Sequence, residues 1–553
     1  MNAKRAALLF AAVAVAGLAV FLRYYESAFP QAAIDLRLSR DEIQDRADAY
    51  LRERGFDPDT FESTLTFSAR GSAAAFLQRV RGLEETSRFA REVLPLWSWD
   101  ARWFRSAEKE EFRLELGPDG EPIRFEHEIP EAAPGDSLSQ DSARALAAAF
   151  ATEQLGVDLD EWRLADEVTR ARDQRIDHTF TWEKIGSEIE WRPDDPEAGT
   201  ASLRLRVEVH GARIGGFARF LRVPEKFSRE QSKETSLGGA FTLGSFALMF
   251  LLVIASLVVA IRRHKGGQVR WRWSLIAGAI AGGAAFVSGL LAYPLLKSAY
   301  PTEIGFGVFV AMAVVSLLFG GLIYGLVVWV TGAAGESLTL DAFPRSLDAF
   351  RGWTEGRWAT PAAAREVLIG YAVGLGFLGY ITAFYLLGRR HLGVWVPAEG
   401  PHSQLLGMYL PWLVPALIAI QASVSEEFML RLFGISFCKR AFKLTFVALL
   451  VPAVIWAFGH SNYPVFPVYV RGIELTIAGV VFGWVFLRYG LVSMLVAHYA
   501  IDAILIAMPF LRAAGGTYVG YGVAALVIAA LPLVIPARVL RRSPDRDPGW
   551  PPR

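Results

Sequence analysis

The stretch QASVSEEFMLRLFGI, residues 421–435, places two adjacent carboxylates and one guanidinium inside an otherwise apolar segment. Ionisable groups within an apolar helix are costly unless they are paired or hydrated, so they are expected to be functional. In a helix Glu427 and Arg431 share a face, whereas Glu426 points about 100° away. The stretch therefore predicts a buried ion pair and a carboxylate left free for other work, within a membrane-spanning helix.

Similar apolar segments extend to both sides of this stretch. Hydrophobic residues make up 53% of the chain and charged residues 20%, and the two kinds are segregated along it. Ten segments approach the roughly 20 residues that a membrane-spanning helix needs. They are residues 6–22, 237–261, 274–294, 305–331, 367–388, 405–437, 443–461, 466–487, 490–511 and 518–537. We therefore expect a polytopic all-α membrane protein with about ten transmembrane helices.

Charge and cysteine content exclude several classes of protein. The net charge of +1 gives no overall basic field, so no nucleic-acid partner is expected. Cys438 is the only cysteine, which excludes an intramolecular disulfide and a cysteine-rich zinc module. The apolar segments make the lipid bilayer an expected partner. The sequence does not indicate an oligomeric state.

Basic residues set the expected topology. Lys4 and Arg5 precede the first segment, which predicts a signal anchor with a cytoplasmic N-terminus, although cleavage after it stays an alternative. Basic clusters follow the second, sixth, eighth and tenth segments, as the positive-inside rule requires of cytoplasmic connections, and Arg389-Arg390 is the exception. The expected location is a bacterial plasma membrane. The expected division is an anchor helix 1–23, an extracytoplasmic domain 24–236, helices two to four in 237–332, a cytoplasmic loop 333–366, a helical core 367–541 and a cytoplasmic tail 542–553.

The exported domain contains an internal repeat. Leu38-Ser39-Arg40-Asp41 and Leu138-Ser139-Gln140-Asp141 each open a helical pattern with serine at the expected N-cap. Each unit closes with alternating strand-like sequence, from Phe112 and from Ser202. We expect two α+β repeats, about residues 36–131 and 136–225, each a helix on a small antiparallel sheet. Their pattern resembles that of PepSY-like modules.

Two further apolar segments carry histidines. One ends in Trp456-Ala457-Phe458-Gly459-His460, and the other contains His498-Tyr499-Ala500-Ile501-Asp502, in which His498 and Asp502 share a helical face. Counted at ~1.5 Å per residue from the predicted helix ends, Glu426, His460 and His498 lie at comparable depths. One polar pocket within the membrane would satisfy all three. Arg471 and Glu474 are three residues apart and are expected to pair without a further role, and Tyr463 is expected at the interface as an aromatic anchor.

The three motifs together resemble the CAAX protease and bacteriocin-processing (CPBP) family, which includes the Ras-converting CAAX prenyl endopeptidase. The family pattern is Glu-Glu-x-x-x-Arg, Phe-x-x-x-His and His-x-x-x-Asn or Asp. This chain has Glu426-Glu427-x-x-x-Arg431, Trp456-x-x-x-His460 and His498-x-x-x-Asp502, in the same order and within residues 405–510. Trp456 stands where phenylalanine is usual, and we expect this exchange to alter the shape of the pocket more than its chemistry.

The resemblance implies an intramembrane endopeptidase that hydrolyses a peptide bond of a membrane-associated substrate. Glu426 and His460 would hold and deprotonate water, and His498 with Asp502 would stabilise the oxyanion. Glu427 and Arg431 would be structural. The resemblance leaves a metal open, because Glu426, His460 and His498 are possible zinc ligands, but no His-Glu-x-x-His helix is present and a metal-free reaction is favoured. The alternative from another class is a non-catalytic membrane scaffold, sensor or transporter with an exported ligand-binding domain.

Overall fold

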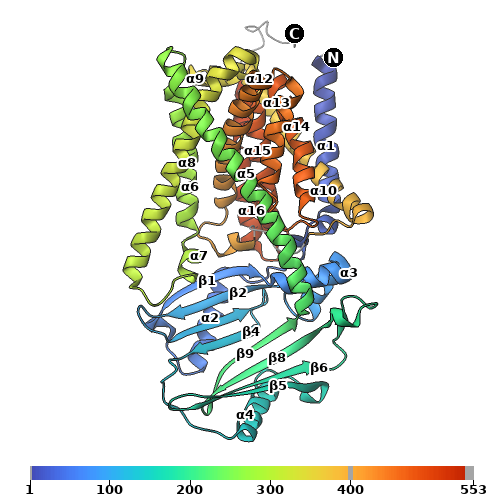
Figure 1. Ribbon diagram of the computed structural model, residues 1–553, viewed down its shortest axis with the longest axis vertical. Coiled ribbons are helices and arrows are strands. Elements are labelled where there is room, and N and C mark those ends of the chain that lie inside the picture. Colours follow the sequence, from blue (N-terminus) through green and yellow to red (C-terminus); the bar gives the residue numbers. More distant parts are fainter. Residues whose placement is uncertain (1–2, 397–402, 542–553) are drawn as a thin grey trace.

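The computed structural model describes residues 3–396 and 403–541 and has two parts, a bundle of long helices and a sheet domain at one end of it (Figure 1). The sheet domain interrupts the bundle in sequence, between its first and second helices. The helices of the bundle are α1 (Ala3–Ala28), α5 (Glu225–Lys265), α6 (Trp271–Leu291), α7 (Tyr293–Ser298), α8 (Phe306–Ala342), α9 (Asp348–Thr354), α10 (Pro361–Leu392), α11 (Val414–Glu426), α12 (Ser436–Phe442), α13 (Thr445–Phe458), α14 (Tyr469–Tyr489), α15 (Leu491–Leu511), α16 (Gly516–Ala529) and α17 (Val534–Arg541). A π-helical stretch, Glu427–Ile435, joins α11 to α12.

Within the described residues, eight helices are long and apolar enough to cross a membrane by length and composition. They correspond to eight of the ten predicted segments. The segment predicted at 405–437 is divided among α11, the π-helical stretch and α12, and the segment predicted at 443–461 contains the 14-residue α13. A membrane protein with several spanning helices is confirmed, and the count of ten stays a prediction.

The loop expected at residues 333–366 is largely helical. Helix α8 continues to Ala342, and α9 and the start of α10 occupy much of the chain from there to residue 366. Glu336, which is buried in this extension of α8, forms an ion pair with Arg270. The residues in this extension of α8 are mostly buried, so packing stabilises the additional helical turns. Hydropathy does not predict these turns, because it takes no account of packing contacts. The expected tail 542–553 lies outside the described residues.

The sheet domain consists of one long sheet with two similar halves. Its helices are α2 (Arg40–Glu53), α3 (Gly71–Glu92) and α4 (Gln140–Glu153). Its strands are β1 (Glu62–Ala69), β2 (Trp97–Phe104), β3 (Glu111–Leu116), β4 (Pro122–Glu128), β5 (Trp162–Ala171), β6 (Ile176–Lys184), β7 (Ile189–Glu190), β8 (Thr200–His210) and β9 (Arg213–Arg222). The strand order is β1-β2-β3-β4-β9-β8-β6-β5, all antiparallel, with β7 paired to β8. Each half is thus a helix followed by four antiparallel strands that pair in chain order, with α3 inserted between β1 and β2 in the first half, and the halves meet through their last strands.

The sequence signals at the start of each half have a clear structural role. Ser39 accepts a hydrogen bond from the amide of Glu42 in a full capping box, and Ser139 accepts one from the amide of Ser142. Both predicted N-caps are therefore confirmed. The likeness of each half to PepSY modules stays a prediction.

The sheet domain is firmly joined to the bundle. Its two faces differ: side chains such as Trp103 point toward α2, while the alternate residues, including Arg102, point toward the bundle. Arg102 forms a buried ion pair with Glu111 and donates to the carbonyl oxygens of Ser298 (2.9 Å) and Tyr300 (2.8 Å), just after α7. Because guanidinium donors and buried carbonyls are satisfied together, the domain is fixed relative to the membrane helices.

The basic pair that breaks the predicted charge pattern has a structural explanation. Helix α1 lies along α10, and Arg389 donates to the carbonyl oxygens of Ser27 (2.6 Å) and Ala28 (3.4 Å) at the end of α1. The last carbonyls of a helix lack partners within it, and a cation there is favourable. Arg389 therefore lies at the end of the bundle that carries the sheet domain (Figure 1), as the predicted topology required.

A tight turn sets the position of α15 against its neighbours. Gly490, between α14 and α15, has a φ of 105°, and a Cβ there would lie 2.4 Å from a carboxylate oxygen of Glu366. The same carboxylate accepts a hydrogen bond from the amide of Val492 in the first turn of α15 (3.2 Å). Only glycine allows both the backbone conformation and this close approach. The turn thereby aligns the helix that carries His498.

A half-buried carboxyl on the bundle-facing side of the sheet predicts a pH-dependent stability. Burial raises the pKa of Asp100 to about 6, and nearby Glu115 adds to the rise. The folded state therefore binds the proton more tightly than the unfolded state, whose reference pKa is 3.8. The stability that protonated Asp100 contributes is complete below pH 3.8 and is lost as the pH rises through about 6. We expect Asp100→Asn, which cannot ionise, to raise the melting temperature at pH 7.5 by about 2–4 °C and to change it little at pH 3.5.

The measurement is thermal unfolding in detergent at the two pH values. The matched control is Asp45→Asn, at an exposed position on α2, which should change the melting temperature little at either pH. An Asp100→Asn effect of equal size at both pH values would contradict the assignment.

Candidate active site

The motif in residues 426–431 lies where the helix changes its winding. Helix α11 ends at Glu426, and the π-helical stretch begins at Glu427. Such wider turns often occur at functional sites because they displace side chains from the regular α-helical positions. Glu427 Oε1 lies 3.2 Å from Arg431 Nη1, and both side chains are buried. The predicted ion pair is confirmed.

The guanidinium of Arg431 is further stabilised by aromatic rings. It lies 4.3 Å from the ring centre of Trp456 and 5.6 Å from that of Phe482. A cation over an aromatic face is attracted to it, more strongly where water is excluded. These contacts offset part of the desolvation of a charge whose side chain is 2% exposed.

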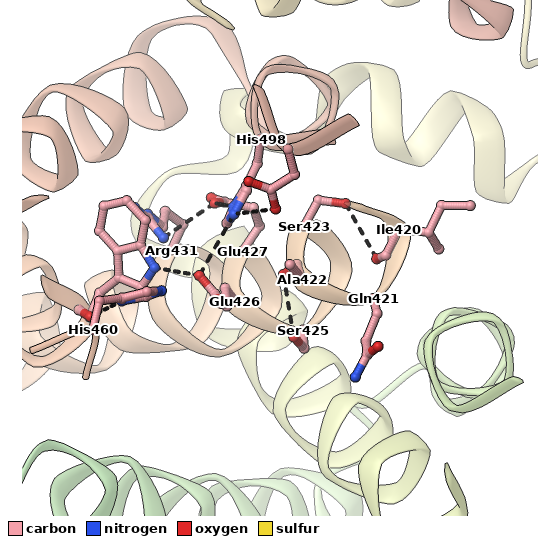
Figure 2. A network of polar contacts seen from close by, with 12 residues as sticks. Ile420, Gln421, Ala422, Ser423, Ser425, Glu426, Glu427, Arg431, His460 and His498 are labelled. Atoms are coloured by element: carbon pink, nitrogen blue, oxygen red, sulfur yellow. Dashed lines mark hydrogen bonds and ion pairs between the residues drawn. The ribbon is translucent and has the colours of Figure 1, made fainter. Parts of the chain in front are cut away.

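His498, from α15, faces three carboxylates (Figure 2). Its Nδ1 lies 2.8 Å from Oε1 of Glu427, and its Nε2 lies 3.5 Å from Asp502 and 3.8 Å from Glu426. The structure thus brings together four residues that the sequence assigned to the site. It also gives Glu427 a second contact, because the carboxylate that pairs with Arg431 also holds the His498 ring.

Trp456, in α13, contributes more than shape. Its indole Nε1–H donates a hydrogen bond to Oε2 of Glu426, which a phenylalanine could not do. Trp456 therefore adds a polar contact to the site, and the expectation that it alters shape more than chemistry stays a prediction. The indole fixes one oxygen of Glu426 and leaves Oε1 free of this contact.

His460 follows α13 and is oriented by the backbone of the same tryptophan. Its Nδ1 lies 2.8 Å from the carbonyl oxygen of Trp456. A carbonyl can only accept, so Nδ1 carries the proton and donates it, and Nε2 is the nitrogen left for other partners. The ring stands edge-on to the indole, with 5.6 Å between ring centres, so that the indole contacts both His460 and Glu426 (Figure 2).

Tyr463 also belongs to this site. Sequence analysis assigned it to the membrane interface, but it is half-buried and its ring centre lies 5.5 Å from that of His460. Its position three residues after His460, in the turn that follows α13, is the signal that could have placed it here. Arg471 and Glu474 pair as predicted, at 2.7 Å, and Tyr385 contacts both.

Exposure divides the site into two groups of residues. The side chains of Glu426 and Asp502 are 23% and 26% exposed, and His460 is half-buried. Glu427, Arg431 and His498 are buried. Groups that could meet a substrate are therefore accessible, whereas the groups that orient them are enclosed.

The arrangement does not form a metal cluster. Among the described residues, no group of three or more His, Cys, Asp and Glu side chains is arranged to hold a metal ion. Glu426 Oε2 is also engaged by the indole of Trp456. The zinc alternative, with Glu426, His460 and His498 as ligands, stays a prediction.

Comparison with known proteins identifies the region that contains these residues. Residues 408–504 match the family model of type II CAAX prenyl endopeptidases, Rce1-like, and this span contains all three motifs. The helical core carries an Rce1-like domain. Since this is a family of endopeptidases, the match to the Rce1-like domain indicates a membrane-embedded peptidase of the CAAX type.

The similarity to one relative extends beyond the Rce1-like domain. The chain is 21% identical over 508 residues to the sporulation-killing factor biosynthesis protein SkfC of Bacillus subtilis (strain 168). The alignment covers 90% of this chain and 94% of that protein, so it includes the sheet domain as well as the bundle. No solved structure matches.

The indole contact of Trp456 predicts the effect of restoring the usual family residue. Trp456→Phe keeps an aromatic face under Arg431 but removes the donor to Glu426. A hydrogen bond to a charged group contributes about 1.5–3 kcal/mol, so loss of this positioning should reduce kcat of peptide hydrolysis by about tenfold or more. We expect KM to change little, because the indole N–H contacts the carboxylate and not the substrate.

The measurement is the separate determination of kcat and KM in proteoliposomes. Trp484→Phe is the matched control, because Trp484 lies on α14 with half of its surface exposed on the outside of the bundle. Equal kcat values for the two variants would show that the indole N–H has no part in positioning Glu426.

Proposed function

We propose that the chain is an intramembrane endopeptidase that hydrolyses a peptide bond of a membrane-associated protein or peptide. The observation that carries this proposal is that Glu426, His460 and His498, from three separate segments of the chain, all contact the indole of Trp456. The match of this segment to CAAX prenyl endopeptidases supports the same reaction class.

Glu426 acts as the general base in the proposed reaction. Its carboxylate, held through Oε2 by Trp456, takes a proton from a water molecule that His460 Nε2 helps to orient. The resulting hydroxide attacks the carbonyl carbon of the scissile bond. The proton held by Glu426 then passes to the leaving amine as the C–N bond breaks, so that the carboxylate is regenerated.

His498 stabilises the oxyanion in this proposal. It acts in the protonated form, donating through Nδ1 to Glu427 and through Nε2 toward the negative oxygen of the tetrahedral intermediate. Asp502, 3.5 Å from Nε2, orients the ring. Glu427 and Arg431 serve as the enclosed support for this histidine.

The proposed orientation has the sheet domain outside the cytoplasm of a bacterial plasma membrane. The basic connections at the other end of the bundle support this, including Lys439 and Arg440 in α12 and Arg488 at the end of α14.

Removal of the general base tests the proposal directly. We expect Glu426→Gln to lower kcat of peptide hydrolysis by about 10²–10⁴-fold, because an amide cannot accept the proton of water at this point. His460→Ala should also lower it, by removing Nε2. The measurement is cleavage of a membrane-delivered peptide by the purified protein in proteoliposomes.

The matched control is Glu303→Gln, at an exposed position before α8, which should hydrolyse at the parent rate. Parent-like hydrolysis by Glu426→Gln and His460→Ala would end the assignment of these two residues to the reaction. A scaffold, sensor or transporter predicts instead that no variant hydrolyses the peptide and that Glu426→Gln alters ligand response or stability alone.

Chelation separates the metal-free reaction from the zinc alternative. Because Glu426 is engaged by Trp456 and the histidines are oriented by protein groups, we expect activity to persist after treatment with 1,10-phenanthroline. The measurement is hydrolysis before and after chelation, together with the metal content of the purified protein. Loss of activity that Zn²⁺ restores, with one bound zinc per chain, would replace the glutamate reaction with a metal-dependent one.

A further inference from the structure

The two halves of the sheet are joined by β4 and β9, and on one side of this strand pair they separate from each other. Strands β4 and β9 pair through only three residue pairs, Arg124↔Ala218, Phe125↔Phe217 and Glu126↔Gly216. β4 begins at Pro122 and β9 continues to Arg222, but no pairs form between these ends. A cleft of about 380 Å³ occupies the space between them.

Four arginines line this cleft, against one carboxylate. The arginines are Arg70, Arg124, Arg206 and Arg219, and the carboxylate is that of Glu115. Glu115 is engaged by Arg70 through two contacts, at 2.9 and 2.7 Å, and by the Ser98 hydroxyl at 2.6 Å. The single carboxylate of the lining is therefore already neutralised.

The remaining arginines are only partly compensated. Arg124 and Arg206 pair with Glu126 (2.5 Å) and Glu208 (3.1 Å), which lie outside the lining and on the same strands as their partners. Arg219 donates to the carbonyl oxygen of Pro122 (2.7 Å), and its buried Nε has no partner among the described residues. The cleft thus holds a guanidinium, that of Arg219, which hydrogen-bonds to a carbonyl oxygen and not to a carboxylate.

Burial lowers the pKa of Arg219, although an arginine remains charged at neutral pH. The backbone adds to the positive potential. Helix α3 begins at Gly71 without a side-chain cap, and its first residues line the cleft. The free amides at a helix N-terminus favour an anion. Ala73, Ala218, Leu221 and Phe220 provide apolar walls beside these donors.

The position of the cleft favours a polypeptide over a lipid headgroup. The strand that lines it ends just before α5, whose first twelve residues, 225–236, are mostly polar and precede the apolar part. At ~1.5 Å per residue this polar part is roughly 18 Å long. An anion bound at the end of β9 is thus separated along the chain from the apolar part of α5 by this polar segment.

Helix α3 also connects the cleft with the candidate active site. Its N-terminus lines the cleft, while Arg79, two turns along, lies 6.0 Å from the ring centre of Trp395. Trp395 pairs with Phe466 through two backbone hydrogen bonds, of 3.0 and 2.9 Å. Phe466 belongs to the loop that begins at His460. An occupant of the cleft would therefore contact α3, and α3 in turn contacts Trp395, which pairs with the segment between α13 and α14 that contains His460.

We propose that this arginine-lined cleft binds a carboxylate of an acidic segment of the polypeptide substrate, outside the membrane, while the scissile bond enters the site of Glu426 and His460. The identity of the occupant as substrate rests on the proposed function. The binding of an acidic polypeptide does not, and it can be measured in a protein that hydrolyses nothing.

The experiment measures binding of a fluorescent Glu-rich peptide, and of its Gln-rich counterpart, to the full chain in nanodiscs. We expect the acidic peptide alone to bind, and added salt to weaken it. Arg219→Gln and Arg206→Gln should each weaken its binding about tenfold, the order expected for a charged hydrogen bond. Arg219→Lys, which keeps the charge without the planar fork, guards against misfolding and should bind with intermediate affinity.

Arg213→Gln is the matched control, because Arg213 is an exposed residue of the same strand outside the cleft, and it should bind like the parent. Equal binding of both peptides, or parent-like binding by the Arg219 and Arg206 variants, would overturn the site. If inorganic phosphate competes in the same concentration range as the peptide, the ligand of the cleft is a phosphate group and not a polypeptide. If vesicles rich in anionic lipid compete, the ligand is a lipid headgroup.

Hydrolysis provides the second readout. For a substrate with an acidic flank, Arg219→Gln should raise KM and leave kcat unchanged, and a substrate without the flank should be cleaved equally by both proteins. If no form of the protein hydrolyses peptides, the proposed function fails while the binding result still decides whether the cleft is an acidic-peptide site. If Arg219→Gln loses binding of the acidic peptide but keeps the parent KM, the cleft binds a ligand other than the substrate.

Discussion

The carboxylate of Glu427 is the group on which the site depends. It is enclosed by protein, and the same oxygen pairs with Arg431 of its own turn and with His498 of another helix. Leaving any one of these charges without its partners in a low-dielectric interior would be strongly destabilising. The three groups therefore fix one another, and in doing so they fix the rotation of α15 against the π-helical stretch.

Two adjacent glutamates, one on each side of the change from α-helical to π-helical winding, contact one histidine. In a regular helix their side chains would diverge by about 100°. Here Glu427 contacts Nδ1 of His498 while Glu426 lies within 3.8 Å of Nε2, on the other side of the ring. The consequence is a division between an enclosed carboxylate that holds the ring and a partly exposed one that can meet water. Trp456 links the two groups, since its ring supports Arg431 and its N–H holds Glu426.

The sheet domain is an integral part of this architecture. Its bundle-facing side is anchored through Arg102, and its last strand leads directly into α5. The two helix-and-meander halves share only three residue pairs, so the sheet opens at the junction and its polar side chains line the gap. A repeated unit thereby creates a feature that neither half has alone. The relative SkfC aligns with both parts, which indicates that sheet domain and bundle occur together in it as well.

By itself the sequence determined the features that depend on local pattern. Apolar runs marked the spanning segments, serine N-caps marked two helix starts, and four-residue spacing paired Glu427 with Arg431. Hydropathy and helical periodicity act between near neighbours, so these features could be predicted. Only the tertiary structure decided that Glu427 holds His498, that Trp456 donates to Glu426 and that a cleft opens between β4 and β9. These partners are tens of residues apart, and their contact depends on the crossing of helices or the parting of strands, which no local spacing encodes.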